Sequence, residues 1–447
     1  MRLFFFLSAA LIAGTSAATA QSLPLEVSLI RDTNTAPDQY GSVPGAFRRI
    51  DDRVYFYASA PQTGRELFST DGTPGGWRLE YDLVPGPMAG YPSPVALGRV
   101  GNRLIVTAMY RLWAYGNGTA VALTPPATFD DNTTPRRAMA NVGGRMLVTS
   151  GNSFDPIWVT DGTPEGTYPQ DTGHGFALPQ RDGADCATNA GSLYTSNYPH
   201  SLVRNDGTVA GSAVIATLPT AATGVALAGR CWFLVGTEDG GTAVWGSDGT
   251  AQGTSEVLRV PGEPRERLVV MNGNLYVATR GANYRVRRYA PSDFAHPSLI
   301  LDVPATGGSL VATRSAVLAF LGHDDGSASV HLGDGGANMR VIHTAPPGGP
   351  NLRSTPYVQG DTVIVLTSPL ATRIDATTGA VTTMQSGRAL SRTFAASLGD
   401  DVIGPGTDDQ EVWISDGTDA GTRQLHALWP DNAHGIGPYA TYRTRVV

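Results

Sequence analysis

The sequence predicts an all-β protein, a single large β-propeller of about nine four-stranded blades, with eight blades as the alternative. Three observations predict this fold class. A motif centred on Asp-Gly-Thr recurs along the chain at a nearly constant spacing, each repeat holds the same succession of short alternating segments, and no stretch has the periodicity of a long amphipathic helix. A β-sandwich would lack the constant spacing, and a β-helix usually has a shorter repeat.

The repeat is clearest in five copies, in which an aromatic or β-branched segment leads into Asp-Gly-Thr. It is degenerate in four more, where Asn replaces the Asp or where the Gly-Thr is altered. The nine anchor residues are Asp71, Asn117, Asp161, Asp206, Asp248, Asp293, Asp334, Asp375 and Asp416. Successive anchors lie 41 to 46 residues apart. Four short strands at this spacing match one propeller blade, so we expect nine repeat units of about 43 residues within residues 21–447.

Each element of a unit has its own local signature. The first strand is a short apolar segment, as at 268–271, and a two-residue turn follows it, as at 272–273. The second strand alternates and is rich in β-branched and aromatic residues, as at 274–278. The third strand leads into the anchor, and the fourth begins soon after it, as at 255–260. We therefore expect the anchor at the turn between the third and fourth strands.

Two terminal segments complicate the blade count. Residues 25–33 have the pattern of a fourth strand with no unit before it, and residues 440–447 have the pattern of one more strand after the ninth unit. Propellers commonly close by pairing terminal strands within one blade, which protects the sheet edges. The number of anchors favours nine blades, while the pattern leaves the manner of ring closure open.

We interpret the anchor motif as a structural turn. The Asp carboxylate accepts backbone N–H groups two residues on, the first Gly supplies a positive φ, the Thr starts the fourth strand, and the second Gly allows another bend. The predicted turn residues are Asp71, Gly72, Thr73, Asn117, Asp161, Gly162, Asp206, Gly207, Asp248, Gly249, Asp416 and Gly417. A ring of Ca²⁺ sites is the alternative, but each motif supplies one carboxylate where such a site needs several oxygen ligands. We therefore expect no metal and no other cofactor.

The best copies of the motif resemble a bacterial repeat with the consensus E-L-W-x-x-D-G-T-x-x-G-T. These copies are residues 66–73, Glu-Leu-Phe-Ser-Thr-Asp-Gly-Thr, and residues 411–422, Glu-Val-Trp-Ile-Ser-Asp-Gly-Thr-Asp-Ala-Gly-Thr. The resemblance implies propeller-like repeats in a secreted or cell-surface bacterial protein, and it implies no defined enzymology. Residues 69–77 are also similar to the Asp-box of sialidase propellers. The Asp-box is itself a structural turn and its spacing differs, so sialidase activity does not follow.

The N-terminus predicts export from the cytoplasm. Residues 1–20 have the pattern of a secretory signal peptide, with Arg2, an apolar run at 3–13 and a cleavage site at Ala18-Thr19-Ala20. No later apolar run is long enough for a membrane-spanning helix. All basic residues are Arg, and the formal net charge of −7 gives no electrostatic reason to bind nucleic acid. We expect an extracytoplasmic, periplasmic or secreted, monomeric protein.

The two cysteines, Cys186 and Cys231, fall in neighbouring repeat units. In an oxidising compartment they could form one disulfide, because strands of adjacent blades face each other. The alternative is a pair of buried free thiols. A bond would require their Cα atoms to lie within about 7 Å.

A few residues outside the turns could bind a ligand. The candidates are Arg285, Arg287, Arg288, His323, Asp324 and Trp429. The arginines could bind an anionic glycan, or they could simply alternate along an exposed strand. The His-Asp pair could form a cation or general-base cluster, or it could be a solvated turn. The Trp lies outside the repeat register, which makes it a candidate for an exposed ring.

The sequence favours a non-catalytic scaffold that binds an unidentified protein or glycan, with a site built from loops at a ring face or at the central channel. This function is a default, because a fold does not by itself establish a function. Two alternatives stay open. One is a propeller hydrolase or lyase acting on a glycan or lactone, for which no catalytic residue is assigned, and the other is a structural or adhesion module at the cell surface.

Overall fold

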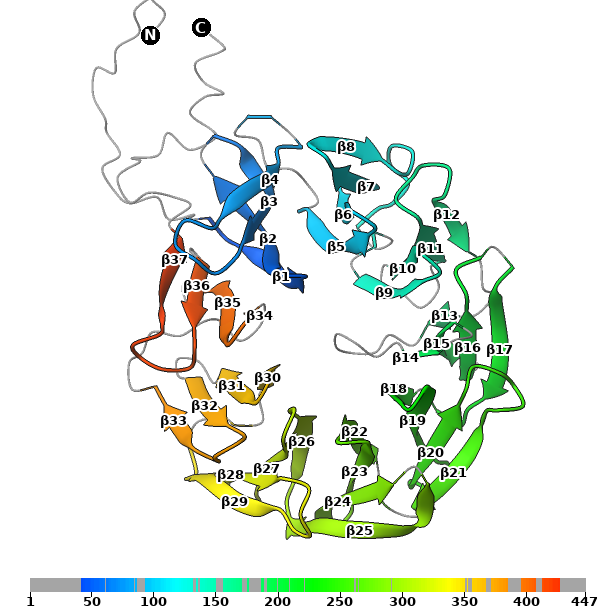
Figure 1. The fold of residues 1–447 in the computed structure, drawn as a ribbon, viewed down its shortest axis with the longest axis vertical. Helices are drawn as coiled ribbons and strands as arrows, with labels where there is room; N and C mark the ends of the chain where they lie inside the picture. Colours follow the sequence, from blue (N-terminus) through cyan, green and yellow to red (C-terminus); the bar gives the residue numbers. More distant parts are fainter. Residues whose placement is uncertain are drawn as a thin grey trace, which may run out of the picture.

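The computed structural model describes residues 42–426, apart from gaps at 61, 84, 87–92, 132–133, 136, 150–155, 171–174, 177–185, 189–190, 199, 209, 221, 261–262, 264, 291, 350–351, 353–355, 367–370, 385–394 and 407–411. Its regular secondary structure is entirely β-strand, in nine sheets that form a ring around a central axis (Figure 1). The predicted β-propeller is confirmed, with nine blades. The predicted signal peptide, the segments 25–33 and 440–447, and Trp429 lie outside the described residues.

The blades follow one another along the chain. Blades 1 to 3 contain β1 (Gly45–Ile50), β2 (Arg53–Ala60), β3 (Gly64–Thr70) and β4 (Arg78–Tyr81); β5 (Val95–Val100), β6 (Arg103–Ala108), β7 (Arg111–Gly116) and β8 (Thr119–Ala122); and β9 (Arg137–Val142), β10 (Arg145–Thr149), β11 (Ile157–Thr160) and β12 (Tyr168–Gln170). Blades 4 to 6 contain β13 (Gly175–Phe176), β14 (Cys186–Thr188), β15 (Gly191–Tyr198), β16 (Ser201–Asn205) and β17 (Ser212–Thr217); β18 (Ala222–Leu227), β19 (Arg230–Gly236), β20 (Thr242–Ser247) and β21 (Ser255–Val260); and β22 (Arg265–Met271), β23 (Asn274–Arg280), β24 (Asn283–Ala290) and β25 (Asp293–Pro304). Blades 7 to 9 contain β26 (Gly307–Ala312), β27 (Val317–Gly322), β28 (Ala328–Gly333) and β29 (Arg340–Ala345); β30 (Pro356–Gln359), β31 (Thr362–Leu366), β32 (Ala371–Asp375) and β33 (Val381–Thr383); and β34 (Ala396–Leu398), β35 (Asp401–Pro405), β36 (Val412–Ser415) and β37 (Arg423–His426).

Each blade is an antiparallel meander whose first strand lies nearest the central axis (Figure 1). In blade 4, β13 and β14 share this innermost position, because both pair with β15. The start of the second strand pairs with the end of the third, as Val54 does with Thr70. The first hairpin and the anchor turn of a blade therefore lie on the same face of the ring, which we call the turn face. The loops between the second and third strands lie on the opposite face, the loop face.

The hydrophobic core lies between neighbouring blades and not inside any one of them. Between blades 6 and 7, for example, Tyr276 and Val286 pack in one buried cluster with Val317 and Leu321. The β-strands alternate so that each blade presents one apolar face to each neighbour. This arrangement buries both faces of every sheet and leaves the outermost strands at the perimeter.

Blade 9 packs directly on blade 1 and closes the ring. Val54 and Phe56 of blade 1 share a buried cluster with Ile403, Val412 and Ile414 of blade 9. Each of these two blades has four strands of its own, all within the described residues. The contact that closes the ring is therefore apolar packing between two complete blades.

A β-bulge recurs between the third and fourth strands of six blades. Its positions on the third strand are Leu67/Phe68, Leu202/Val203, Val244/Trp245, Val286/Arg287, Val330/His331 and Val412/Trp413. In five of the six, the second residue of the pair stands three positions before the anchor Asp. A bulge increases the local twist of a strand pair, so these outer strands share a common bend.

Candidate functional site

The anchor turn is built around one carboxylate oxygen. In blade 3, Asp161 Oδ1 accepts the backbone N–H of Thr163 at 2.8 Å and its hydroxyl at 2.6 Å. Gly162 between them has a φ of 85°, a conformation that a side chain would strain. Asp71, Asp206, Asp248 and Asp416 make the same pair of hydrogen bonds to the Thr two residues on.

The second Gly of the motif is required by close approach to the same carboxylate. A Cβ at Gly76 would lie 1.6 Å from Asp71 Oδ1, and one at Gly166 would lie 2.0 Å from Asp161 Oδ2. A Cβ there would push the carboxylate out of its hydrogen bonds to the Thr, so the turn favours Gly at this position. The third feature of the turn is a hydroxyl pair, since the oxygens of Thr160 and Thr167 lie 2.7 Å apart.

One detail of the predicted turn is wrong. The Thr of Asp-Gly-Thr does not start the fourth strand, which begins later, at Arg78 in blade 1 and at Tyr168 in blade 3. The hydroxyl of this Thr instead donates to the Asp carboxylate. The backbone carbonyl of the same Thr can accept a hydrogen bond from the hydroxyl of the last Thr of the motif, as the carbonyl of Thr163 does from Thr167 at 2.6 Å. The Thr is thus part of the turn, and its β-branched side chain is not used for strand formation.

Blade 2 uses a different turn at its anchor. Asn117 and Gly118 have φ values of 53° and 73°, and they connect β7 directly to β8. Two central residues with positive φ are typical of a type I′ hairpin. Asn117 therefore occupies the anchor position but not the Asp-Gly-Thr geometry. The degenerate anchors keep more of that geometry, because Asp334 and Asp375 still accept the N–H two residues on.

The anchor carboxylates are committed to their own turns. The hydrogen bonds from Thr163 lower the pKa of Asp161, and the corresponding bonds from Thr73 lower the pKa of Asp71. Within the part of the chain that the structure describes, no group of three or more His, Cys, Asp or Glu side chains is placed to hold a metal ion.

Several anchor turns are also held by the preceding blade. In each case an arginine donates to a backbone carbonyl of the turn in the next blade: Arg103 to Gly162, Arg145 to Gly207, Arg288 to Gly335 and Arg373 to Asp416. We call these the inter-blade arginine contacts. They link the turn face from blade to blade with charge-assisted hydrogen bonds.

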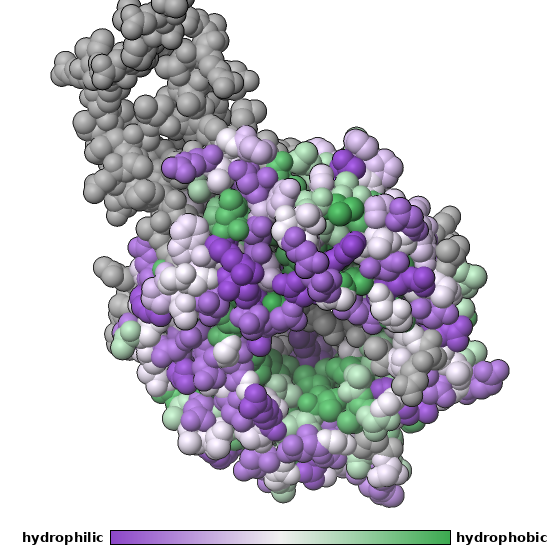
Figure 2. All heavy atoms as spheres, turned by 45° about the horizontal axis from the view of Figure 1, so that its top comes forward, coloured by the Kyte–Doolittle hydropathy of each residue, from purple (hydrophilic) through white to green (hydrophobic). Residues whose placement is uncertain are grey.

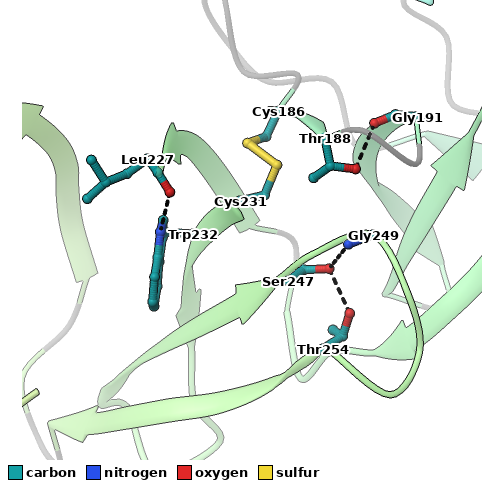
Figure 3. Close-up of a disulfide and its surroundings, with 9 residues drawn as sticks. All are labelled: Cys186, Thr188, Gly191, Leu227, Cys231, Trp232, Ser247, Gly249 and Thr254. Carbon is teal, nitrogen blue, oxygen red and sulfur yellow. Dashed lines mark hydrogen bonds between the residues drawn. A yellow bond between two sulfur atoms is a disulfide. The ribbon is translucent and has the colours of Figure 1, made fainter. Parts of the chain in front are cut away.

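The two cysteines form a disulfide between blades 4 and 5 (Figure 3). Cys186 on β14 and Cys231 on β19 have an S–S distance of 2.06 Å and a Cα–Cα distance of 5.6 Å, within the usual range. The bond joins a strand next to the central axis to the second strand of the following blade. Trp232 lies beside it and donates its indole N–H to Leu227 O at 3.3 Å.

The three candidate arginines of blade 6 do not form a free basic patch. Arg285 and Arg287 both bind Glu263, whose Oε2 lies 2.7 Å from Arg287 Nη1. Arg285 also lies 3.3 Å from Asp302, and Arg288 makes an inter-blade arginine contact. The hydrogen bond from Arg287, ahead of those from Thr279 and Arg285, lowers the pKa of Glu263 to about 2. These charges are satisfied within the protein, so the predicted anionic-glycan site is not supported here.

His323 belongs to a polar chain that the sequence does not reveal. Its Nδ1 lies 3.0 Å from Pro304 O, and its Nε2 lies 2.8 Å from the hydroxyl of Ser329, which in turn lies 3.0 Å from His331 Nε2. Because a carbonyl only accepts, a neutral His323 ring carries its proton on Nδ1 and accepts the Ser329 hydroxyl at Nε2. Asp324 is exposed in the adjacent turn and is not drawn into this chain.

His331 stands three residues before its anchor, where three other units carry Trp. That substitution was the available sequence signal for the polar chain. Burial of the ring lowers the pKa of His331 and favours its neutral form. Ser329 and His331 are each only 5% exposed, so His323, which is half-buried, is the member of the chain that solvent reaches most readily.

The centre of the ring is hollow and its lining is two-sided. Figure 2 shows hydrophobic residues gathered on the visible wall of the hollow. The innermost strands of blades 5 to 8 contribute half-buried aliphatic side chains near the turn face: Leu227, Val269, Val270, Val311, Ala312 and Val358. We call this set the apolar arc.

Arginines lie on the other side of the hollow. Figure 1 places β1 and β5 across the centre of the ring from β22 and β26. Near their turn-face ends, β1 carries Arg48 and Arg49 and β5 carries Arg99. We call these three residues the arginine arc. Arg99 Nε lies 2.8 Å from an oxygen of Asp51, and Arg49 Nε donates to Asp51 O at 3.0 Å. The innermost strands that carry the apolar arc and the arginine arc together surround the turn-face mouth of the hollow.

Comparisons with known proteins return structures and no sequence family. No protein-family model matches the chain, and no curated protein matches it. A puromycin hydrolase mutant is 15% identical with a TM-score of 0.39, over 86% of this chain and 53% of that one. A prolyl endopeptidase is 11% identical with a TM-score of 0.43, over 77% and 50%. The computationally designed Ika8 protein is 12% identical with a TM-score of 0.40, over 78% and 96%. The chain thus spans about half the length of the two enzymes.

Proposed function

We propose that the protein is an extracytoplasmic, non-catalytic binding protein whose ligand occupies the turn-face mouth of the central hollow. The observation that carries this proposal is the two-sided lining of that mouth, aliphatic on blades 5 to 8 and cationic on blades 1 and 2. Concave sites with a mostly apolar lining and a few placed polar groups are typical of ligand-binding proteins.

Two features support the extracytoplasmic location. The disulfide between Cys186 and Cys231 is stable in an oxidising compartment, and residues 1–20 have the signal-peptide pattern. Membership in the bacterial E-L-W-x-x-D-G-T repeat family is part of the same proposal, supported by the structural use of each motif residue in the anchor turns. Among the described residues, no helix has the length and hydrophobicity needed to cross a membrane.

The test is ligand-induced stabilisation of the full chain. A panel of apolar peptides, oligosaccharides and amphiphiles is screened for a rise in the thermal unfolding midpoint, because a ligand that binds the folded state stabilises it. We expect the rise to disappear in Val269→Arg, which places a charge on the apolar arc, and to persist in Val257→Arg on the outer strand β21. No rise with any member of the panel, or an equal rise in both variants, would contradict the proposal.

A hydrolase is the second candidate, and the polar chain of blade 7 favours it. A serine hydroxyl that donates to a histidine, which is itself oriented through Nδ1, has the geometry of an activated nucleophile. Ser329 would be the nucleophile and His323 the base, at a hydroxyl-to-Nε2 distance of 2.8 Å. Reaction with a fluorophosphonate probe, followed by peptide mapping, decides the matter: labelling that is lost in Ser329→Ala supports a hydrolase, and an unlabelled protein rejects it.

A further inference from the structure

We infer that the turn-face mouth binds an anionic amphiphile, an aliphatic chain that ends in a carboxylate. This inference rests on the proposed function, since it names the ligand class of the same site. The aliphatic part would lie on the apolar arc and the carboxylate would lie on the arginine arc.

The apolar arc is aliphatic over four neighbouring blades at the turn-face end of the hollow. The ionisable residues of β22, including Glu266, lie at its other end, and Glu266 pairs with Arg280 at 2.7 Å. Asp361, which follows β30 at the turn face, spends its carboxylate on Ser315 at 2.7 Å and 2.8 Å. The side chains of the apolar arc pack partly into the cores between the blades. Where they are open to the hollow, they offer a chain of methylenes about 0.8 kcal/mol for each group that is buried.

The apolar arc disfavours a glycan. Its aliphatic side chains present no hydrogen-bond partners for hydroxyl groups, and a hydroxyl buried against them loses the bonds that it makes with water. A sugar would find its partners at the backbone edges of the innermost strands and at the arginine arc, whereas an aliphatic chain also uses the side chains of the apolar arc. The proposal follows from this difference in what the two ligands can satisfy.

The arginine arc supplies the charge complementarity. Its three guanidinium groups lie near two carboxylates, from Asp51 and Asp52. This is a local cationic excess in a protein whose formal net charge is −7. Arg99 bonds Asp51 and the Tyr55 hydroxyl, and Arg48 donates to Leu97 O, so Arg49 is the member of the arc that meets the ligand. Arg49 is exposed and uses Nε for Asp51 O, which leaves its two terminal nitrogens on the side of the solvent. A guanidinium binds a carboxylate through two parallel hydrogen bonds.

Calorimetric titration of the full chain with decanoate tests the inference. The comparison ligands are decanol, which lacks the charge, decyltrimethylammonium, which reverses it, and octanoate, which is shorter by two methylenes. We expect decanoate to bind more tightly than decanol and decyltrimethylammonium. Octanoate should bind about fifteenfold more weakly than decanoate, because each buried methylene contributes about fourfold.

Matched variants locate the two ends of the ligand. Arg49→Gln should weaken decanoate about tenfold and leave decanol unchanged, whereas Arg259→Gln on the outer strand should change neither. Val269→Thr, which keeps the side-chain shape, should weaken both ligands, whereas Val257→Thr should change neither. Circular dichroism and the thermal midpoint of each variant verify that it is folded.

The outcomes separate this inference from the proposed function. Binding of a peptide or an oligosaccharide that Val269→Arg abolishes, together with no binding of decanoate, overturns the amphiphile and keeps the binding site. Equal affinity for decanoate and decyltrimethylammonium also overturns it, because the arginine arc then plays no part. If none of the tested ligands binds at the mouth, the amphiphile inference and the proposed function are both overturned.

Discussion

At the scale of single residues, the anchor turn shows how one carboxylate can determine several neighbouring residue types. Asp161 bonds the N–H and the hydroxyl of Thr163, and it occupies the space in which a Cβ of Gly166 would stand. The Asp therefore selects both the Thr and the second Gly by contact. All of these contacts lie within six residues, so these three residue types depend on one another locally in each copy of the turn.

A matched pair of glycines in blade 1 tests this account. A Cβ at Gly76 would lie 1.6 Å from Asp71 Oδ1, while one at Gly75 would meet nothing within 4 Å. Gly76→Ala should lower the free energy of unfolding by about 2–4 kcal/mol, whereas Gly75→Ala should change it by less than about 0.5 kcal/mol. Denaturant titrations measure both. The double variant Gly76→Ala and Asp71→Ala should lose less free energy of unfolding than the two single variants lose together. A double loss equal to that sum would contradict the clash between the Cβ and the carboxylate.

Glu263 gives a prediction about acid stability. Its pKa of about 2 in the folded protein lies below the ordinary 4.5, so its stabilising effect is complete above pH 4.5 and is lost as the pH falls towards 2. At neutral pH, Glu263→Gln should reduce the free energy of unfolding by up to about 3 kcal/mol. In denaturant titrations, the difference in the free energy of unfolding between the wild type and Glu263→Gln should become smaller as the pH falls from 4.5 towards 2. A difference independent of pH would contradict the role of the carboxylate.

Asp401 gives the opposite dependence. Burial, and next the nearby Asp416, raise the pKa of Asp401. An acid with a raised pKa in the folded state destabilises the protein as the pH rises through that pKa. Asp401→Asn should therefore increase the free energy of unfolding at neutral pH, and the increase should vanish below the ordinary pKa of 3.8. A variant less stable than the wild type at pH 7 would show that the carboxylate has a favourable partner.

At the scale of elements, the position of Asp401 matters because four other blades start the second strand with arginine. Arg53 and Arg230 donate to a carbonyl of their own anchor turn, and Arg103 and Arg145 donate to the turn of the next blade. Arginine at this position therefore holds an anchor turn from either side. Blade 9 lacks it at the start of β35, and its turn is held by Arg373 of blade 8 at 2.8 Å.

The disulfide is a covalent link between β14 and β19, and its removal should measurably lower the free energy of unfolding. Cys186 and Cys231 are separated by 45 residues, so their bond restricts the unfolded chain strongly. The double variant Cys186→Ala and Cys231→Ala should lose about 2–4 kcal/mol in denaturant titration. Reductant should lower the stability of the wild type and leave the variant unchanged. Equal responses to reductant would contradict a disulfide in the folded protein.

At the scale of the whole molecule, the features that could be predicted from sequence are those that depend on local chemistry. The blade period follows from the anchor spacing, and the Asp turns follow from bonds between residues two apart. The type I′ turn at Asn117 was also visible in principle, because Asn-Gly favours it.

The features that could not be predicted depend on residues that only the ring brings together. Glu263 stands in the connection before β22, far in sequence from Arg285 and Arg287, so its pairing with them required the blade. The recurrent bulges depend on cross-strand register, which the sequence pattern does not specify. The turn-face mouth could not be predicted either, because β1 and β22 face each other across the hollow only when blade 9 has packed on blade 1.

The way the ring closes has a mechanical consequence. Eight of the nine interfaces join blades that are consecutive in the sequence, and the one between blades 4 and 5 also carries a disulfide. The interface between blades 9 and 1 is held by side-chain packing around Phe56 and Ile414. A pulling force applied across the ring would therefore separate these two blades first. The circle would then open into a curved row of blades, still in sequence order, that could close again once the load was removed.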